Sequence, residues 1–345
     1  MGQLRICLVG FGWFGRIHLD AWRQVPEAQV VAVCDADEQS FSTDLVHAQD
    51  AFHQTAEGAQ KASLGGLECY SDLGKMLREM APDLVDICVP EAAHAGVARA
   101  VLSAGVSVIV EKPFTTNAAD ARLLAMQARS AGLRIFVGNV LRFDPRYVHA
   151  IEDLGLRPSP PRYISLQRHF QRSALDVYGR VHPFFGACIH DIDIAVWAHR
   201  AKPARVLGKV VQGSDGAAFT AAFAALEWAG GATAVIQNAW LLSPSAPAGF
   251  AFESSFFADA GTITIRSQPV VEVTGADGSR WPEFFFWPSI NGVRGGAIVE
   301  ELRHFASCEQ VRRESERIPV EQACWGIEVA ERLVQSARDG AWVDV

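Results

Sequence analysis

Lys112 and His190 are the residues in this sequence best suited to activate a hydroxyl group. Lys112 belongs to a Glu-Lys-Pro motif that follows the apolar residues 106–110. Because such a stretch is typical of a buried parallel strand, we expect the lysine at the carboxyl end of a sheet, where open α/β sheets bind ligands. His190 is followed closely by two aspartates, which can tune an imidazole. Taken alone, the first motif also fits a solvated strand end, and the second fits a histidine packed in a core.

A glycine turn near the start of the chain has the pattern of a dinucleotide-binding site. Residues 10–15 read Gly10-Phe11-Gly12-Trp13-Phe14-Gly15, between apolar residues 4–9 and a predicted helix that runs to about residue 23. Gly10 permits the tight turn, Gly12 lets the backbone approach a pyrophosphate, and Gly15 allows close packing of helix on strand. The helix N-terminus supplies N–H groups and a dipole for the anion. The alternative is that these glycines serve only the geometry of the turn.

Asp35 follows the next predicted strand, residues 30–34, at roughly the spacing of 20 residues expected of a ribose-binding acid. Its carboxylate would accept hydrogen bonds from ribose hydroxyls and repel a 2′-phosphate. No Arg or Lys occurs between residues 36 and 44 to receive such a phosphate. The sequence therefore favours NAD over NADP.

A lysine, a histidine and a nicotinamide together suit the oxidation of a secondary alcohol, which needs an acceptor for the hydroxyl proton as hydride leaves. A free lysine has a pKa of about 10.4 and is protonated at neutral pH. A nicotinamide cation ~5 Å away costs the ammonium about 3 kcal/mol at an effective dielectric of ~20, and so lowers the pKa of the lysine. A carboxylate from Glu111 aimed at the ammonium would raise it. We therefore expect Lys112 to polarise the reacting oxygen and His190, with a usual pKa of ~6.5, to share the hydroxyl and take its proton.

The elements that must position these residues alternate between strand and helix in the first part of the chain. Apolar strands are predicted at residues 4–9, 30–34, 67–70, 84–89, 106–110 and 133–137, with helices between them, one of them running from residue 38 to about 61. Repeated units of this kind predict an α/β domain with a doubly wound parallel sheet, which we assign to residues 1–140.

Longer, alternating strands dominate the rest of the chain, residues 141–345. They are predicted at 163–168, 206–211, 219–228, 232–241, 252–257, 262–265, 270–273 and 283–287, with helices near 147–154, 187–198, 298–307 and 322–337. Few crossovers indicate an α+β domain with a large, mostly antiparallel open sheet. The aromatic run Phe284-Phe285-Phe286-Trp287 breaks the alternation. We expect it to bury both faces of its strand, and the chain to form a homo-oligomer through this sheet.

Composition and charge limit the kinds of binding partner and the cellular compartment that we expect for this protein. The net charge is −8 and no Lys/Arg cluster occurs, which argues against nucleic acid and anionic membrane as partners. No apolar run approaches the ~18 residues of a membrane span, and the first residues lack signal-peptide anatomy. The seven cysteines include no Cys-x-x-Cys pair. We expect a reduced, cytoplasmic protein without a bound metal.

Taken in order, the motifs resemble those of the glucose–fructose oxidoreductase / inositol dehydrogenase / MocA (Gfo/Idh/MocA) family. The resemblance rests on the glycine turn with Asp35, Pro90 with His94, Glu111-Lys112-Pro113, Arg142-Phe143-Asp144-Pro145 and His190-Asp191-Ile192-Asp193. It implies a Rossmann domain, a second domain on an open sheet, and nicotinamide chemistry on a sugar, sugar derivative or cyclitol. It also implies that Lys112 and His190 are the catalytic pair, and that the sheet forms a homodimer or homotetramer.

The remaining site assignments follow the same resemblance. The expected cofactor-binding residues are Gly10, Gly12, Trp13, Phe14, Gly15, Asp35, Pro90, His94, Glu111, Lys112 and Asn139. The expected substrate-binding residues are Arg142, Arg168, Asp176, Tyr178, His182 and Asp191.

The sequence departs from the family at Gly186, four residues before His190, where inositol-type dehydrogenases usually carry an Asp. Glycine has no side chain to orient the imidazole or to bind a substrate hydroxyl. Asp176, Tyr178 and His182, just upstream, are candidates to replace that carboxylate, although each also fits a simple loop residue.

Two other functions remain open. Some members that resemble this pattern are NAD-dependent glycosidases, which oxidise C3 transiently in order to eliminate an aglycone. A non-catalytic NAD-binding regulator, like the galactose-regulon co-repressor that shares the fold, is the other. The loss of the Asp at position 186 permits a regulator, whereas the presence of both Lys112 and His190 argues against it.

Overall fold

The computed structural model describes residues 2–42, 64–153, 160–213, 219–267, 270–275, 278–281 and 284–345. Within these ranges the chain forms two compact units. The first contains the described residues up to 144 together with 284–324, and the second contains 145–281 and 325–345. The first unit is therefore built from two separate parts of the sequence.

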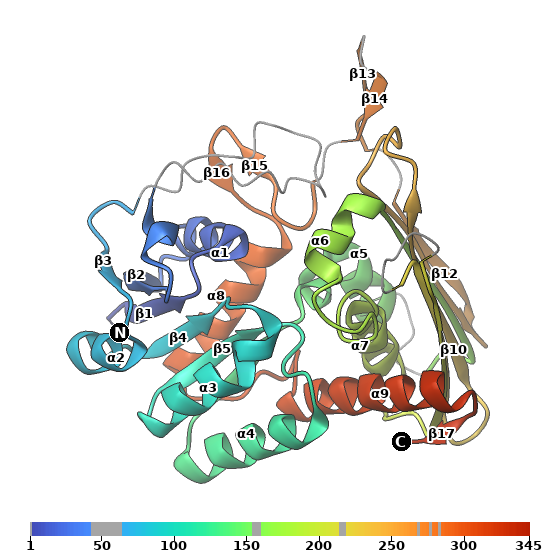
Figure 1. The fold of residues 1–345 in the computed structure, drawn as a ribbon, viewed down its shortest axis with the longest axis horizontal. Helices are drawn as coiled ribbons and strands as arrows, with labels where there is room; N and C mark the ends of the chain where they lie inside the picture. Colours follow the sequence, from blue (N-terminus) through green and yellow to red (C-terminus); the bar gives the residue numbers. More distant parts are fainter. Residues whose placement is uncertain are drawn as a thin grey trace. The chain divides into compact units, whose positions relative to one another are not determined.

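A parallel sheet of the order β3-β2-β1-β4-β5-β6 is the centre of the first unit (Figure 1). Its strands are β1 (Leu4–Val9), β2 (Ala28–Cys34), β3 (Glu68–Tyr70), β4 (Leu84–Ile87), β5 (Ser107–Glu111) and β6 (Ile135–Gly138). Every residue of β4, β5 and β6 is buried, as expected of parallel strands covered on both faces. The predicted Rossmann-type sheet is confirmed.

Helices connect these strands, as the sequence predicts. They are α1 (Trp13–Trp22), α2 (Leu73–Met80), α3 (His94–Ser103) and α4 (Ala118–Ala131), with short turns η1 (Glu38–Phe41), η3 (Glu91–Ala93) and η4 (Val140–Phe143). At the start of α4 the side chain of Asn117 accepts a hydrogen bond from the Asp120 N–H at 2.8 Å and so caps the helix. The helix predicted from residue 38 begins only as the 3₁₀ turn η1, and its residues 43–61 lie outside the described residues.

The later segment of the first unit contributes the helix α8 (Ala297–Gln310). Phe305 stacks on Phe136 of β6 with ring centroids 5.1 Å apart. Glu309 forms a buried ion pair with Arg134, just before β6. Both contacts join residues about half the chain apart, so the later segment completes the hydrophobic core of this unit.

The second unit is organised on a sheet of the order β12-β11-β7-β10-β9-β8-β17. Its strands are β7 (Tyr163–Gln171), β8 (Arg205–Val211), β9 (Ala221–Glu227), β10 (Thr233–Leu242), β11 (Phe250–Ala258), β12 (Gly261–Arg266) and β17 (Val343–Asp344). All neighbours are antiparallel except β7 and β10, which are parallel. The predicted mostly antiparallel open sheet is confirmed.

Helices cover part of this sheet. They are α5 (Pro145–Val148), η5 (His149–Asp153), η6 (Arg172–Ala174), α6 (Leu175–Tyr178), α7 (Cys188–His199) and α9 (Val320–Asp339), whose first residues belong to the first unit. The helix α7 lies against β10. Ser336 of α9 accepts a hydrogen bond from the N–H of Gly208 in β8 at 2.9 Å. Since β10 is the central strand of the seven, α7 lies over the middle of the sheet.

The strand predicted at residues 283–287 is wrong. Phe284–Trp287 is irregular and belongs to the first unit, as do the short hairpin strands β15 (Ser289–Ile290) and β16 (Val293–Arg294). The strand predicted at 270–273 is also displaced, because pairing begins at β13 (Val273–Gly275) with β14 (Gly278–Arg280). The aromatic run therefore does not belong to the open sheet.

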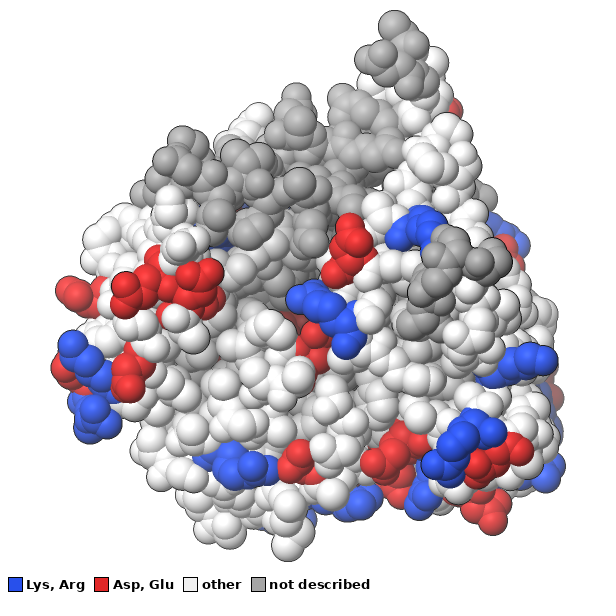
Figure 2. Space-filling model, viewed as in Figure 1, with Lys and Arg blue, Asp and Glu red and all other residues white. Residues whose placement is uncertain are grey.

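Charged side chains of both signs are interspersed on the face drawn in Figure 2. In the described part of the chain, no helix combines the length and the apolar character that a membrane span requires.

Candidate active site

The glycine turn crosses closely over the end of β4. Gly10 has φ of +92°, and a side-chain carbon there would lie 2.6 Å from the carbonyl carbon of Cys88. A side-chain carbon at Gly15 would lie 2.0 Å from the carbonyl oxygen of Gly10. A larger residue at either position would force the backbone apart. At Gly12, by contrast, nothing lies within 4 Å of that carbon, so the start of α1 is open at this point.

The open start of α1 fits the pyrophosphate of a dinucleotide. Its N-cap is Gly12, which offers no side chain to the helix, and the first turn carries no acidic residue. The first amides of a helix have no intrahelical acceptor and sit at the positive end of the helix dipole. Trp13 and Phe14, the first two residues of α1, are half-buried with ring centroids 5.6 Å apart. These features match the predicted anion site.

Asp35 is held directly against the glycine turn. One carboxylate oxygen accepts the N–H of Phe11 at 2.7 Å, and the other accepts the N–H of Asp37 at 2.9 Å. A carboxylate has about four acceptor positions, so capacity remains for ribose hydroxyls. The Asp35 carboxylate is therefore placed so that it can bind an adenosine ribose, as the sequence predicts.

Arg16 lies beside this position, and the sequence reasoning missed it. Its guanidinium donates to the carbonyl oxygens of Ser40 at 2.5 Å and Ser42 at 3.1 Å, and stacks over Phe11 at 4.5 Å. Residues 36–44, which follow Asp35, contain no cation, whereas Arg16 comes from the preceding helix α1. Burial lowers its pKa from the usual value. The signal available in the sequence was its place four residues after Gly12, one turn into α1.

At the end of β5, the Lys112–Pro113 peptide is cis, and His94 spans the two neighbouring strand ends. Its Nδ1 lies 2.7 Å from the carbonyl oxygen of Pro113, and its Nε2 lies 2.9 Å from that of Val89. Burial lowers the pKa of His94, and a neutral imidazole donates through one nitrogen only. The histidine predicted for the cofactor site therefore braces the backbone on which Lys112 stands, and Pro90 forms the N-cap of the adjacent turn η3.

Glu111 turns its carboxylate into the first unit. One oxygen accepts the N–H of Lys112 at 3.1 Å, and the other lies 3.4 Å from Nε2 of His18. A side-chain carbon at Gly138 would lie 2.2 Å from that second oxygen, so a larger residue there would displace the Glu111 carboxylate. The Glu111 carboxylate is buried and points toward β6 and α1, between the backbone N–H of Lys112 and the imidazole of His18.

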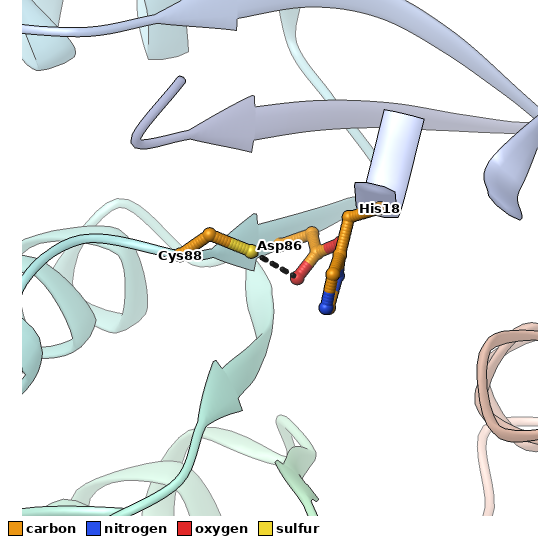
Figure 3. A group of neighbouring side chains, drawn as sticks. All are labelled: His18, Asp86 and Cys88. Carbon is orange, nitrogen blue, oxygen red and sulfur yellow. Dashed lines mark hydrogen bonds and ion pairs between the residues drawn. The ribbon is translucent and has the colours of Figure 1, made fainter. Parts of the chain in front are cut away.

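His18 joins Glu111 to a buried cluster with Asp86 and Cys88 (Figure 3). Asp86 accepts from Nδ1 of His18 at 2.8 Å, from the indole N–H of Trp22 at 2.8 Å, and from the thiol of Cys88 at 3.8 Å. Burial alone would lower the pKa of His18, but Asp86 and Cys88 raise it well above the usual value. A positively charged imidazole therefore lies between two buried carboxylates.

The same three side chains have the geometry of a possible metal site, because their ligand atoms lie within 4.8 Å of one another. Their chemistry favours hydrogen bonding instead. Burial raises the pKa of the Cys88 thiol, whereas a metal ligand must be a thiolate. Asp86 already accepts three hydrogen bonds, from His18, Trp22 and Cys88, whereas Nε2 of His18 makes no hydrogen bond and lies 3.4 Å from Glu111.

In the second unit, His190 is half-buried in the first turn of α7, next to a clamp formed by Asp191. Asp191 accepts from the guanidinium of Arg168 at 3.0 Å and from the amide of Asn238 at 2.9 Å. Arg168 and Asn238 are partners in register on β7 and β10. Burial alone would lower the pKa of Arg168, but Asp191 raises it above the usual value. The clamp fixes the helix turn from which His190 projects.

Tyr178 and Val181 are the residues nearest to the missing side chain at Gly186. A side-chain carbon at Gly186 would lie 3.2 Å from the carbonyl oxygen of Tyr178 and 3.6 Å from its ring. The Tyr178 ring is half-buried and packs on Phe170 with centroids 5.0 Å apart. Asp176 is exposed, and His182 accepts a hydrogen bond from the N–H of Phe184 at 3.4 Å, its pKa lowered by burial.

Arg142 and Asn139 lie in the first unit, at the turn η4. Arg142 is fully buried and donates to the carbonyl oxygen of Arg317 at 2.9 Å and to the side chain of Gln322 at 2.6 Å. Asn139 is buried and begins η4. Lys112 belongs to the first unit and His190 to the second.

Comparison with known proteins finds one family model and many relatives. Residues 4–139 match GFO_IDH_MocA, described as an oxidoreductase family with an NAD-binding Rossmann fold. A D-apiose dehydrogenase of Paraburkholderia graminis is 33% identical over 174 residues, which is 50% of this chain and 41% of that protein. An inositol 2-dehydrogenase of Saccharopolyspora erythraea is 26% identical over 284 residues, 80% of this chain and 78% of that protein.

Among solved structures, GenD2 from gentamicin A biosynthesis, crystallised in complex with NAD, superposes with a TM-score of 0.84. It is 20% identical in sequence, and the match covers 100% of this chain and 97% of that one. At this identity the likeness concerns the fold.

Proposed function

We propose that this chain is a member of the Gfo/Idh/MocA family of oxidoreductases, whose NAD-binding Rossmann model matches residues 4–139, and that it oxidises a secondary alcohol of a sugar, sugar derivative or cyclitol, or reduces the corresponding ketone. The observation that carries the proposal is the glycine turn bonded to Asp35, at the open start of α1. The names of its relatives, an apiose and an inositol dehydrogenase, support polyhydroxylated substrates.

The cofactor, when bound, accepts or returns the hydride. Gly12, Trp13 and Phe14 would hold its pyrophosphate, and Asp35 its ribose. We also propose that residues 1–140 bind the cofactor, and that residues 141–345 bind the substrate and form the oligomer.

Lys112 and His190 would divide the work on the reacting hydroxyl. The Glu111 carboxylate is directed at His18 and at the backbone N–H of Lys112. Lys112 is then a cation that polarises the substrate oxygen, and His190 takes the proton.

On the substrate side, we propose Tyr178 as the replacement for the family's carboxylate, since of the three candidates it is the one that lies next to Gly186. Its hydroxyl can both donate and accept a hydrogen bond to a substrate hydroxyl. Asp176 and His182 remain proposals of the same kind. Arg142, Arg168 and Asp191 are engaged in buried contacts, so we propose that they shape the substrate site through the elements they hold.

A screen of polyols and glycosides that follows NADH absorbance tests the function, with Lys112→Ala and His190→Ala as variants. Each variant should lower kcat by about a hundredfold or more, since general acid–base help is worth about that much, while NADH affinity stays nearly unchanged. Lys209→Ala, at an exposed lysine of β8, is the matched control.

Nearly normal turnover in both variants would refute the proposed roles. Tight retention of NAD through purification, with glycoside cleavage that needs no added NAD, would instead assign the chain to the glycosidase class. Binding of NAD without reduction of it across the whole panel would favour a regulator. Stronger binding of NADP than of NAD would refute the role given to Asp35.

We further propose a cytoplasmic homodimer or homotetramer that forms through the open sheet. The support is one sheet face that exposes Tyr163, Phe223 and Phe257, with the rings of Tyr163 and Phe257 5.5 Å apart. A monomer mass in light scattering at micromolar concentration would contradict the assembly.

A further inference from the structure

We propose that Trp287 is a positioning residue for the dinucleotide site, because it packs on the two aromatic residues that begin α1. The proposal rests on the proposed function only in requiring that NAD bind at the glycine turn. It concerns a residue far along the chain from that turn, in a run of aromatics that the sequence places in a different domain.

The contact is made by ring edges and faces within the first unit. The Trp287 ring centroid lies 6.1 Å from that of Trp13, at an interplanar angle of 82°. It lies 5.6 Å from that of Phe14, at 78°. Both arrangements are the edge-to-face geometry that aromatic pairs prefer. One indole thus braces both of the residues between the second and third glycines of the turn.

The loop that carries Trp287 is anchored at both ends. We call residues 285–296 the aromatic loop. At its start, the carbonyl oxygens of Phe285 and Phe286 accept hydrogen bonds from the N–H groups of Ala297 and Ile298, at 2.7 and 3.0 Å. Gly296 closes the loop with φ of +81°, and a side-chain carbon there would lie 2.6 Å from Pro288. The loop is therefore tied to the N-terminus of α8.

A second tie joins the aromatic loop to α1 itself. Arg294 donates to the carbonyl oxygen of Trp287 at 2.5 Å, and its guanidinium lies 3.8 Å from the carboxylate of Asp20. Asp20 belongs to α1. The position of Trp287 relative to the helix is thus set by its own ring contacts and by an ion pair further along the same helix.

These ties matter because Trp13 and Phe14 supply the backbone at the start of α1, where the pyrophosphate is expected. A site held in its binding conformation before the ligand arrives gains affinity, since less ordering is required on binding. The rings of Trp13, Phe14 and Trp287 are each half-buried, whereas Phe286 beside them is buried like a core residue. Trp287 therefore covers the turn at the surface and does not fill the interior.

The test is the affinity of the intact chain for NADH, measured by titration of the nicotinamide fluorescence and by stopped-flow dissociation. Trp287→Ala should raise the Kd for NADH about tenfold, mainly through faster dissociation, as the loss of two aromatic contacts suggests. Its kcat at saturating cofactor should stay within about twofold of that of the wild type. Trp287→Phe should recover most of the affinity.

Two further variants separate positioning from general stability. Arg294→Gln removes the tie to α1 without opening an apolar cavity, and should raise the Kd for NADH in the same direction by a smaller factor. Phe284→Ala removes an exposed ring just before the aromatic loop, and should leave the Kd unchanged.

Unchanged NADH affinity in both Trp287→Ala and Arg294→Gln, with a wild type that binds NADH, overturns the inference and leaves the proposed function standing. A wild type that binds neither NADH nor NADPH overturns both. If Trp287→Ala does not fold, Trp287→Phe and Arg294→Gln decide the question through the same measurement.

Discussion

At the scale of single residues, the structure adds a buried charge to the chemistry that the sequence suggested. The sequence predicted Gly10, Gly12, Gly15 and Asp35 from their spacing, and their geometry fits a dinucleotide. His18 escaped notice because a lone histidine within a helix carries no signal of its own. Its meaning depends on Asp86 and Glu111, which strands far along the sequence bring to within 2.8 and 3.4 Å.

The charge on His18 should make stability depend on pH. Its pKa in the folded chain lies well above the unfolded value of about 6.5. The stabilisation from His18 is therefore complete below about pH 6.5, and is lost as the pH rises through the folded pKa. We expect the free energy of unfolding of the wild type to fall as the pH becomes alkaline. His18→Gln should not show this fall, because it lacks the titrating imidazole.

Urea unfolding of both proteins between about pH 5.5 and 9.5 measures the effect. The groups that face His18 are Asp86, Cys88 and Glu111, with the ring of Phe14 at 4.8 Å. His149→Gln, at an exposed histidine, is the control. A constant difference in free energy between the wild type and His18→Gln over this range would mean that the pKa of His18 is the same in the folded and the unfolded chain, and would contradict the prediction.

At the scale of elements, the helix α7 shows how a pair of strands holds the helical turn that carries His190. The sequence predicted this helix from its apolar pattern, and predicted Asp191 on the substrate side by resemblance. No pattern in the sequence indicates that Arg168 and Asn238 lie in register on parallel strands, because that pairing is set by tertiary packing of the sheet. The clamp on Asp191 is consequently visible only in the structure.

Removing the clamp should cost stability. Asp191→Asn leaves the buried guanidinium of Arg168 without a carboxylate, which costs about 3–5 kcal/mol of the free energy of unfolding in comparable pairs. The matched control is Asp259→Asn, since Asp259 pairs with Arg162 at the same 3.0 Å but on the surface. An exposed pair of this kind contributes little to stability, because both charges remain solvated and are screened by salt.

Chemical denaturation of the two variants provides the comparison. Equal losses for Asp191→Asn and Asp259→Asn would show that the buried clamp stabilises the second unit no more than a surface ion pair does.

At the scale of the whole molecule, the first unit is discontinuous in sequence. The strand–helix alternation predicted residues 1–140 as a domain, because every parallel strand of its sheet lies there. The return of residues 284–324 left no comparable signal. Its aromatic run resembled a strand, and only the packing of Phe305 on Phe136 and of Glu309 on Arg134 shows which core it serves.

A fragment that ends at residue 140 should therefore fold poorly. It would expose Phe136 and leave Arg134 without its carboxylate, so we expect no cooperative thermal transition and little NADH binding. A control chain that joins residue 144 to residue 284 by a Gly/Ser linker keeps both contacts and should recover NADH binding. Full NADH affinity in the short fragment would show that the later segment is dispensable.

This discontinuity also has a consequence for synthesis on the ribosome. The chain between residues 144 and 284 is made while the core of the first unit still lacks α8. At roughly 5–20 residues per second, the interval before residue 324 emerges lasts on the order of 10–40 s. During that time Phe136 and its neighbours are an exposed apolar surface that a chaperone could hold. The cofactor site would thus mature late, after most strands of the second sheet have already been translated.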